Sequence, residues 1–348
     1  MYNYRLKTLT PIHIGNGNKL SNNFDYIIKG TQINVISFDR YISSLSENEI
    51  SKLESYIETL EKGNSIFDLI RKPTYEEIKY SVILNTQTPN PKVREIAEHI
   101  KTVLNEKGEY GAYIPGSTVK GFIRLAIFYK ILKENANLVN CNEKEKIKKT
   151  EENIFSVELQ KQTLKLMTYF KVADSEPIST KNLEVRNVII TNNKISEFAE
   201  VIKKDTEIKI SIEDKEFQEK LSKLNLKSKY LETIKNWKRA CYEFSKSIIE
   251  YEKEFFKKKG LVKLHNFYKD LEDKNSPKSP LLRIGKYKGK ISQTLVLLYE
   301  TNKEKYGCLF EDKKGKSDKN INPLPKTRRI TDAEDSLPLG WVKLEELN

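Results

Sequence analysis

The sequence contains few of the residues that build metal sites, disulfide scaffolds or membrane spans. Its 348 residues include three cysteines and three histidines, all of them scattered, and no CxxC pair. No apolar stretch approaches the ~20 residues that cross a bilayer, and residues 1–5 have no signal-peptide core. We therefore expect a soluble cytoplasmic protein without a metal site, a cofactor or a contact with membranes.

Arginine is also scarce, with 10 arginines against 52 lysines, although the chain carries a formal net charge of +13. A lysine-rich surface without any partner would explain that charge if the charge were evenly spread. Residues 281–330, however, hold 13 basic and 5 acidic residues, a net charge of +8 in a small part of the chain. This clustering favours an anionic partner, and nucleic acid is the commonest one.

Strand-like and helical patterns alternate along the chain without a long parallel βαβ series, which predicts an α+β fold. The clearest helices are expected over 117–133 and 231–255, where apolar residues recur every three or four positions. Strands are expected over 1–10, 25–28, 32–38, 167–172, 185–190, 206–212 and 294–299. Near the end of the chain, Trp341 is expected to anchor the closing segment onto the core.

A histidine beside two glycines follows the first predicted strand. Gly15 and Gly17 let another backbone approach closely, and His13 could stack on a base, bind a phosphate or act as a general acid or base. A structural histidine that holds the turn is the simpler alternative to catalysis, because no second catalytic residue lies nearby in the sequence. His99 and His265 lie in charged, helical surroundings and are expected at the surface.

The Pro-Gly-Ser-Thr segment combines a turn with the start of the first long helix. Ser117 or Thr118 is expected to cap that helix, and Lys120 lies in its first turn, where the helix dipole disfavours a cation unless an anion is near. Arg124 is four residues further on and shares the face of Lys120. With Gly121 between them, these residues form a candidate phosphate cradle. The alternative is an ordinary capped helix with solvated basic residues.

Two basic segments further along the chain are candidates for RNA contacts. Residues 282–290 form a glycine loop around an aromatic residue, which suits a single-stranded backbone with one base stacked on the ring. The loop is not a P-loop, because Ile291 stands where a Ser or Thr would bind magnesium. The closing Pro-Lys-Thr-Arg-Arg segment is a plausible phosphate clamp. The candidate residues are Arg283, Gly285, Lys286, Tyr287, Lys288 and Gly289 in the loop, and Lys326, Arg328 and Arg329 in the clamp.

Together, these segments resemble the RAMP superfamily of CRISPR-associated proteins. The resemblance rests on Pro-Ile-His-Ile-Gly at 11–15, Ile-Pro-Gly-Ser-Thr-Val-Lys-Gly-Phe-Ile-Arg at 114–124, Val-Ala-Asp-Ser at 172–175 and the late glycine loop. The order of the segments, with Pro-Lys-Thr-Arg-Arg followed closely by Pro-Leu-Gly-Trp-Val-Lys, is most similar to the fifth Csm subunit family of type III-A effector complexes. The late loop departs from the tighter Gly-x-Gly spacing that is usual in the superfamily.

The resemblance implies two tandem ferredoxin-like, RRM-related modules. The first, over residues 1–200, would carry a helical insertion, and the second, over 201–348, a long helical segment and the basic glycine loop. The resemblance also implies a non-catalytic RNA-binding subunit that caps the effector filament at the 3′ end of the crRNA, beside the repeated backbone RAMP subunit and other Csm subunits. Such a subunit would support crRNA 3′-end maturation, through recruited host nucleases, and antiviral defence.

Two other function classes stay open. Related RAMP proteins cleave precursor guide RNA without a metal ion, and His13 would then be the general acid or base of an endoribonuclease. A general RNA-binding protein unrelated to CRISPR would need only the basic loops. The sequence shows no HD pair, no cluster of metal-binding carboxylates and no paired histidines, which argues against an enzyme. The residues themselves indicate single-stranded RNA binding on an α+β scaffold.

Overall fold

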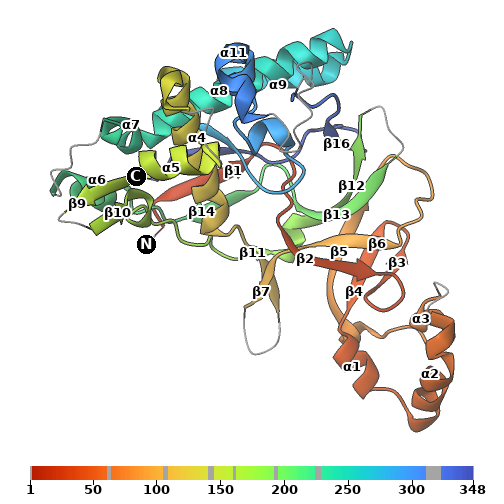
Figure 1. Cartoon of the computed structure of the whole chain (residues 1–348). Coiled ribbons are helices and arrows are strands. Elements are labelled where there is room, and N and C mark those ends of the chain that lie inside the picture. The colour runs from red at the N-terminus through yellow and green to blue at the C-terminus, as the bar shows by residue number, and fades with distance from the viewer. Residues whose placement is uncertain are drawn as a thin grey trace.

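The structure, a computed structural model, describes residues 2–60, 64–104, 109–139, 145–159, 162–191, 195–223, 229–310 and 323–347. Two large β-sheets lie beneath a layer of helices, so the predicted α+β class is confirmed (Figure 1). The α-helices are α1 (Phe38–Ser43), α2 (Glu47–Leu60), α3 (Ile66–Leu69), α4 (Gly116–Glu134), α5 (Lys146–Phe155), α6 (Asp214–Lys223), α7 (Leu231–Lys235), α8 (Trp237–Lys258), α9 (Val262–Lys274), α10 (Leu297–Thr301) and α11 (Lys303–Tyr306). None of these helices is both long and apolar enough to span a bilayer.

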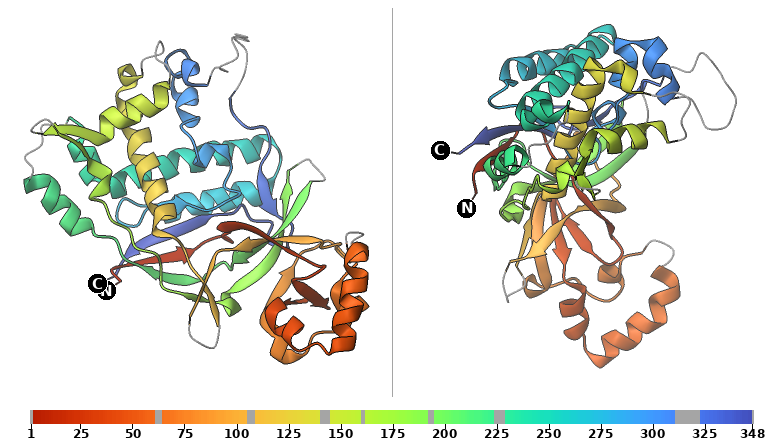
Figure 2. Two further views of the ribbon diagram at one scale, coloured as in Figure 1. Left: turned by 60° about the horizontal axis from the view of Figure 1, so that its bottom comes forward. Right: turned by 60° about the vertical axis from the view of Figure 1, so that its left-hand side comes forward.

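The first sheet joins the two ends of the chain. Its strands run in the order β14 (Glu207–Ile210), β1 (Tyr4–Thr8), β17 (Trp341–Glu346) and β15 (Leu281–Arg283), and all its pairings are antiparallel. Leu6 lies opposite Ile208 on one side and Leu344 on the other, and all three side chains are buried. The N- and C-terminal ends therefore lie side by side (Figure 2). Trp341 is fully buried, as predicted for an anchor.

The second sheet holds most of the remaining strands. Its order is β2 (Gly15–Ser21), β6 (Glu95–His99), β13 (Ser196–Ile202), β12 (Leu183–Ile190), β5 (Ile78–Asn85), β4 (Gln32–Ile36) and β3 (Tyr26–Lys29), and β16 (Arg329–Thr331) also pairs with β12. A smaller sheet has the order β11 (Ile178–Ser179), β8 (Tyr110–Ala112) and β7 (Lys101–Val103). Another consists of β9 (Ser156–Leu159) paired with β10 (Gln162–Lys165). Both large sheets combine strands from either side of residue 200, and the division into tandem ferredoxin-like modules stays a prediction.

The two long predicted helices are confirmed as α4 and as α7 followed by α8. The apolar stripe of α8 is core, because Trp237, Phe244 and Ile248 are all buried. Phe244 packs against α4, where its ring centroid lies 5.5 Å from that of Phe122 and 4.7 Å from that of Tyr129. The contact between α4 and α8 therefore holds the helical layer together above the first sheet.

Two predicted strands are wrong. The segment predicted as a strand over 167–172 begins with a 3₁₀ turn at Leu166–Thr168, and the one over 294–299 leads into α10. In the second case Leu295, Val296, Leu297 and Leu298 are all buried. A continuous apolar run that is buried on every side shows neither a helical nor a strand period, so sequence reasoning cannot assign it.

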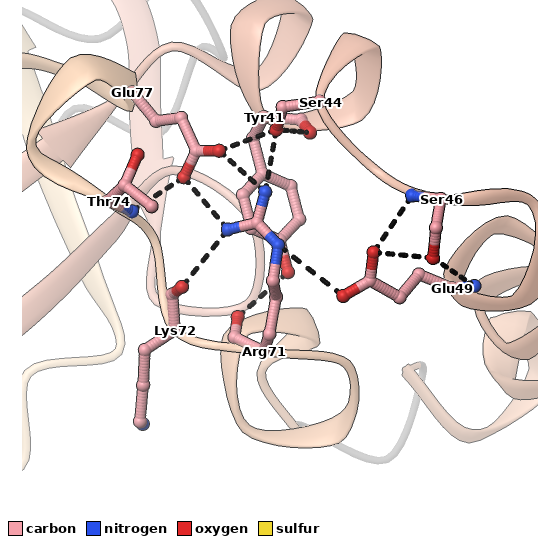
Figure 3. A network of polar contacts seen from close by, with 8 residues as sticks. All are labelled: Tyr41, Ser44, Ser46, Glu49, Arg71, Lys72, Thr74 and Glu77. Carbon is pink, nitrogen blue, oxygen red and sulfur yellow. Dashed lines mark hydrogen bonds and ion pairs between the residues drawn. The ribbon is translucent and has the colours of Figure 1, made fainter.

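Helices α1, α2 and α3 form a small unit beside the second sheet, with a hydrophobic cluster of their own (Figure 1). Arg71 is the centre of its polar contacts (Figure 3). Its guanidinium makes two contacts with the buried Glu77, at 2.6 and 3.1 Å, and lies 4.8 Å from the ring centroid of Tyr41. The Ser44 hydroxyl also donates to Glu77, at 2.5 Å. These bonds, with that from Arg71 the strongest, lower the pKa of Glu77 to about 2.

The α1–α3 unit is expected to lose stability at acid pH. The pKa of Glu77 is lower in the folded state than its ordinary value of 4.5, so the stabilisation is complete above about pH 4.5 and is lost as the pH falls towards 2. The shift corresponds to on the order of 3 kcal/mol. Arg71→Met should remove the largest single contribution to this stabilisation at neutral pH, and hydrogen exchange of the amides in α1 and α3 measures the loss. Lys72→Met, which removes an exposed ion pair with Asp68, is the matched control and should leave exchange unchanged.

Candidate nucleic-acid-binding cavity

Three of the segments singled out in the sequence meet at one open cavity of about 610 Å³. The first loop, defined as residues 13–19, runs into the irregular start of β2 and contributes His13, Ile14, Gly15, Gly17, Asn18 and Lys19. The start of α4 contributes Ser117, Thr118, Gly121 and Phe122, and the basic loop contributes Gly285, Lys286 and Lys288. Gln293 just after the basic loop, and Ala97 and Glu197 from the second sheet, complete the lining. Nine of these were predicted as RNA-binding residues: His13, Gly15, Gly17, Ser117, Thr118, Gly121, Gly285, Lys286 and Lys288.

The first loop and the basic loop are joined through a backbone contact that requires glycine. The Lys286 amide donates to the His13 carbonyl at 2.8 Å. Gly285 has φ +83°, and a Cβ atom there would lie 2.4 Å from the same carbonyl oxygen. Any other residue at 285 would therefore push the two loops apart. Glycine in this loop sets the shape of the cavity wall.

A distant aspartate organises the start of α4. The Asp174 carboxylate accepts a hydrogen bond from the Gly116 amide at 2.8 Å, and the Ser175 hydroxyl accepts one from the Ile114 amide at 2.9 Å. Pro115 stands at the N-cap, so the predicted cap by Ser117 or Thr118 is wrong. Because Asp174 takes over the capping bond, both hydroxyl side chains are left on the cavity wall.

Lys120 and Arg124 share a face of α4, as predicted, but that face does not line the cavity. The Arg124 guanidinium forms an ion pair with Glu151 of α5 at 2.6 Å and lies 5.3 Å from the ring centroid of Phe155. Lys120 is half-buried, and burial together with the nearby Arg124 lowers its pKa. The structure therefore places Ser117, Thr118 and Gly121 of the predicted phosphate cradle in the cavity wall and its two basic residues outside the lining, with Arg124 paired to another helix.

The cavity has three lysines, and their ion pairing differs. Lys19 pairs with Glu95 at 2.6 Å, and Lys286 pairs with Glu197 at 3.1 Å. Lys288 has no ion-pair partner within the part of the chain that the structure describes. Burial, and to a lesser degree Arg283, lowers the pKa of Lys288 to about 8. A bound anion would relieve this unfavourable environment, so Lys288 is the strongest candidate for a phosphate contact.

Two arginines predicted to contact RNA lie instead in the core. Arg283 and Arg328 are 2% and 5% exposed, and both meet Glu252 of α8, which is fully buried. The Arg328 guanidinium contacts Glu252 at 2.6 Å and lies 3.8 Å from the ring centroid of Phe255, and Arg283 approaches Glu252 at 3.5 Å. This cluster of two arginines and one glutamate joins the basic loop and the closing segment to the helical layer. Neither guanidinium can reach a surface ligand.

Tyr287 is likewise buried, so the base stacking predicted for it is not available at the surface. The ring centroid of Tyr287 lies 5.3 Å from that of His13. The guanidinium of the exposed Arg329 lies 5.2 Å from the same Tyr287 centroid. Arg329 and Lys326 are exposed, away from the cavity lining, and Gly289 is half-buried. Their contacts with RNA stay predictions.

His13 is held by a buried polar network that sequence reasoning missed. Its Nδ1 lies 2.7 Å from the carbonyl oxygen of Glu200, and its burial lowers the pKa of the imidazole to about 4. The fully buried Glu200 side chain accepts hydrogen bonds from the Tyr80 hydroxyl at 2.7 Å and from the His99 amide at 2.9 Å, and also contacts Lys101. The sequence signal that could have indicated this network is a glutamate, Glu200, inside the apolar run Phe-Ala-Glu-Val-Ile of β13.

The prediction that His99 and His265 lie at the surface is wrong for His99, which is fully buried and accepts a hydrogen bond from the Ile14 amide at 3.0 Å. His265 is half-buried, with its Nδ1 3.1 Å from the carbonyl oxygen of Lys253. Among the described residues, no group of three or more His, Cys, Asp or Glu side chains could hold a metal ion. The cavity thus offers hydroxyls, amides and amines to a ligand.

The protein class can now be assigned from two features. They are the α+β fold and the basic cavity, at which glycine-containing segments from distant parts of the chain meet. The family model of the RAMP superfamily matches residues 5–337, and the chain belongs to that superfamily. The family resemblance seen in the sequence is therefore confirmed.

Individual relatives are more specific. The chain is similar to the CRISPR system Cms protein Csm5 of Methanocaldococcus jannaschii, with 27% identity over 389 residues that cover 98% of this chain and 88% of that protein. It is also similar to a chain in the cryo-EM structure of a Csm-crRNA-target RNA ternary complex of a type III-A CRISPR-Cas system, with a TM-score of 0.71, 26% identity, and coverage of 99% of this chain and 100% of that chain. The crystal structure of T. onnurineus Csm5 shares the fold, with a TM-score of 0.61, 22% identity, and coverage of 97% and 99%.

Proposed function

We propose that the protein is a non-catalytic RNA-binding subunit of a type III-A CRISPR effector complex that caps the effector filament at the 3′ end of the crRNA. Its partners are the crRNA and the other Csm subunits, above all the repeated backbone RAMP subunit. From that position in the cytoplasm it supports crRNA 3′-end maturation, carried out by recruited host nucleases, and antiviral defence. Its similarity over nearly its whole length to a chain of a Csm-crRNA-target RNA complex supports this proposal.

The observation that carries the proposal is the convergence of three distant glycine-containing segments on one cavity. Glycines let a nucleic-acid backbone approach closely, and Ser117 and Thr118 offer hydroxyls to phosphate or sugar. Lys288 supplies a positive charge that the protein itself does not neutralise. These are the groups that bind a single strand without reading its sequence.

The environment of His13 favours binding over cleavage. A general acid must hold its proton near the working pH and a general base must bind one readily, but the pKa of about 4 leaves His13 neutral and only weakly basic at pH 7. Its Nδ1 is also occupied by the carbonyl of Glu200. We expect repeat-containing RNA incubated with the pure protein in EDTA to stay intact. Site-specific cleavage that disappears in His13→Ala would instead establish the endoribonuclease alternative.

Reconstitution of the effector complex tests the capping role. Complexes assembled with and without this chain on a 3′-labelled crRNA are treated with a single-strand-specific nuclease. With the chain present, protection should extend further towards the crRNA 3′ end than in its absence. An identical protected length in both complexes would contradict a cap at that end.

A further inference from the structure

His13 carries a hydrogen-bond acceptor beside the cavity. A carbonyl oxygen only accepts hydrogen bonds, so the 2.7 Å contact with the Glu200 carbonyl places the imidazole proton on Nδ1. The neutral ring then carries a lone pair on Nε2. The hydrogen bond from Nδ1 to the Glu200 carbonyl thus fixes Nε2 as an acceptor.

This acceptor has no partner within the described part of the chain. The side chain is 1% exposed, so water does not solvate Nε2 as it would at an open surface. Buried polar atoms in proteins are nearly always hydrogen-bonded, and an unsatisfied one is unfavourable. An unpaired Nε2 is therefore suited to a ligand that brings a donor.

Gly15 is the cavity-lining residue next to Nε2. A Cβ atom built on Gly15 would lie 3.0 Å from Nε2, and the next nearest atom outside the imidazole, the Glu98 carbonyl oxygen, would be 3.8 Å away. Gly15 is exposed and, like His13, lines the cavity. Because glycine has no side chain, this Cβ position is unoccupied, and a ligand atom placed there would be within hydrogen-bond distance of Nε2.

The chemistry of a nucleic acid limits which of its groups can satisfy Nε2. Phosphodiester oxygens carry no proton at neutral pH, and a deoxyribose has no hydroxyl at its 2′ carbon. The ribose 2′-hydroxyl can donate, and it is the group through which proteins distinguish RNA from DNA. It occurs on every nucleotide, as a cavity that does not read sequence requires, and it lies next to the phosphate for which Lys288 is a candidate ligand.

We infer that the cavity recognises a ribose 2′-hydroxyl through His13 Nε2, which makes His13 the residue that selects RNA over DNA. The inference rests on the proposed function in that an RNA strand occupies this cavity. His13 acts here as a specificity-determining acceptor, and no covalent step is involved.

Binding of three oligonucleotides with one base tests this inference. Oligo(U) carries the 2′-hydroxyl, oligo(dU) lacks it, and 2′-fluoro oligo(U) lacks the donor but keeps an RNA-like sugar pucker. The wild-type protein should bind oligo(U) roughly tenfold more tightly than either analogue. Because the base is constant, a donor on the base cannot produce this difference.

Gly15→Ala keeps the buried histidine and covers its Nε2 with a methyl group. Gly15 does not have a positive φ, so alanine fits its backbone. We expect this variant to bind all three oligonucleotides with similar affinity, whereas His265→Ala, the matched histidine control, should keep the wild-type preference. Equal affinity of the wild type for all three oligonucleotides, or an unchanged preference for oligo(U) in Gly15→Ala, would overturn this inference and leave the proposed function standing. Failure of the wild type to bind any of the three would overturn the proposed function.

Discussion

Glu252→Ala is expected to lower the thermal unfolding midpoint by roughly 5–10 °C. The substitution leaves the guanidinium groups of Arg283 and Arg328 in the core without their shared carboxylate. Breaking a buried ion pair by removing one partner costs about 3–5 kcal/mol, because the remaining charge stays buried without compensation. Differential scanning calorimetry of the wild type and the variant measures the shift.

The matched control for Glu252 lies on the same helix. Glu250 pairs with Lys246 at 3.8 Å, and both side chains are about half exposed. Glu250→Ala should therefore change stability by no more than ~0.5 kcal/mol. If Glu252→Ala unfolded at the same temperature as this control, the two arginines would not depend on Glu252, and their assignment to the core rather than to RNA would lose its energetic support.

Lys288→Gln is expected to weaken binding of single-stranded RNA by about tenfold or more, because a charge-assisted contact with phosphate contributes on the order of 1.5–3 kcal/mol. Burial holds the pKa of free Lys288 at about 8, and a bound phosphate would raise it. Affinity should therefore be constant below about pH 8 and fall as the pH rises above it, since binding then requires uptake of a proton. Fluorescence anisotropy titrations from pH 7 to pH 9.5 measure both effects.

Lys269→Gln is the control for Lys288, because it removes one exposed lysine of α9 outside the cavity lining. This variant should lose little affinity and should keep the fall above pH 8. The Lys288 variant should lose the fall as well as the affinity. A wild-type affinity that does not change between pH 7 and pH 9.5 would contradict the phosphate contact.

The sequence predicted the parts of the site that depend on local chemistry. Glycine and proline mark the first loop, the turn before α4 and the basic loop, and a three- and four-residue apolar period marks α4 itself. These signals are properties of a few neighbouring residues. They identified the three segments of the cavity wall, although nothing in the sequence showed that the segments meet.

The errors concern residues whose partners are distant in the chain. The cap of α4 comes from Asp174, 58 residues after Gly116, and the partner of Arg328 is 76 residues away on α8. A basic residue near a glycine loop looks the same in sequence whether it faces a phosphate or a buried glutamate. The face shared by Lys120 and Arg124 was predicted correctly, but the partner of Arg124 is Glu151, on another helix.

Photocrosslinking of RNA to the intact protein tests the central claim, that the three segments form one RNA-binding cavity. Single-stranded RNA containing 4-thiouridine is bound, irradiated and digested, and the crosslinked peptides are identified by mass spectrometry. We predict crosslinks in residues 13–19, 117–122 and 285–288. Crosslinks confined to the α1–α3 unit or to α9, with none in these three segments, would contradict it.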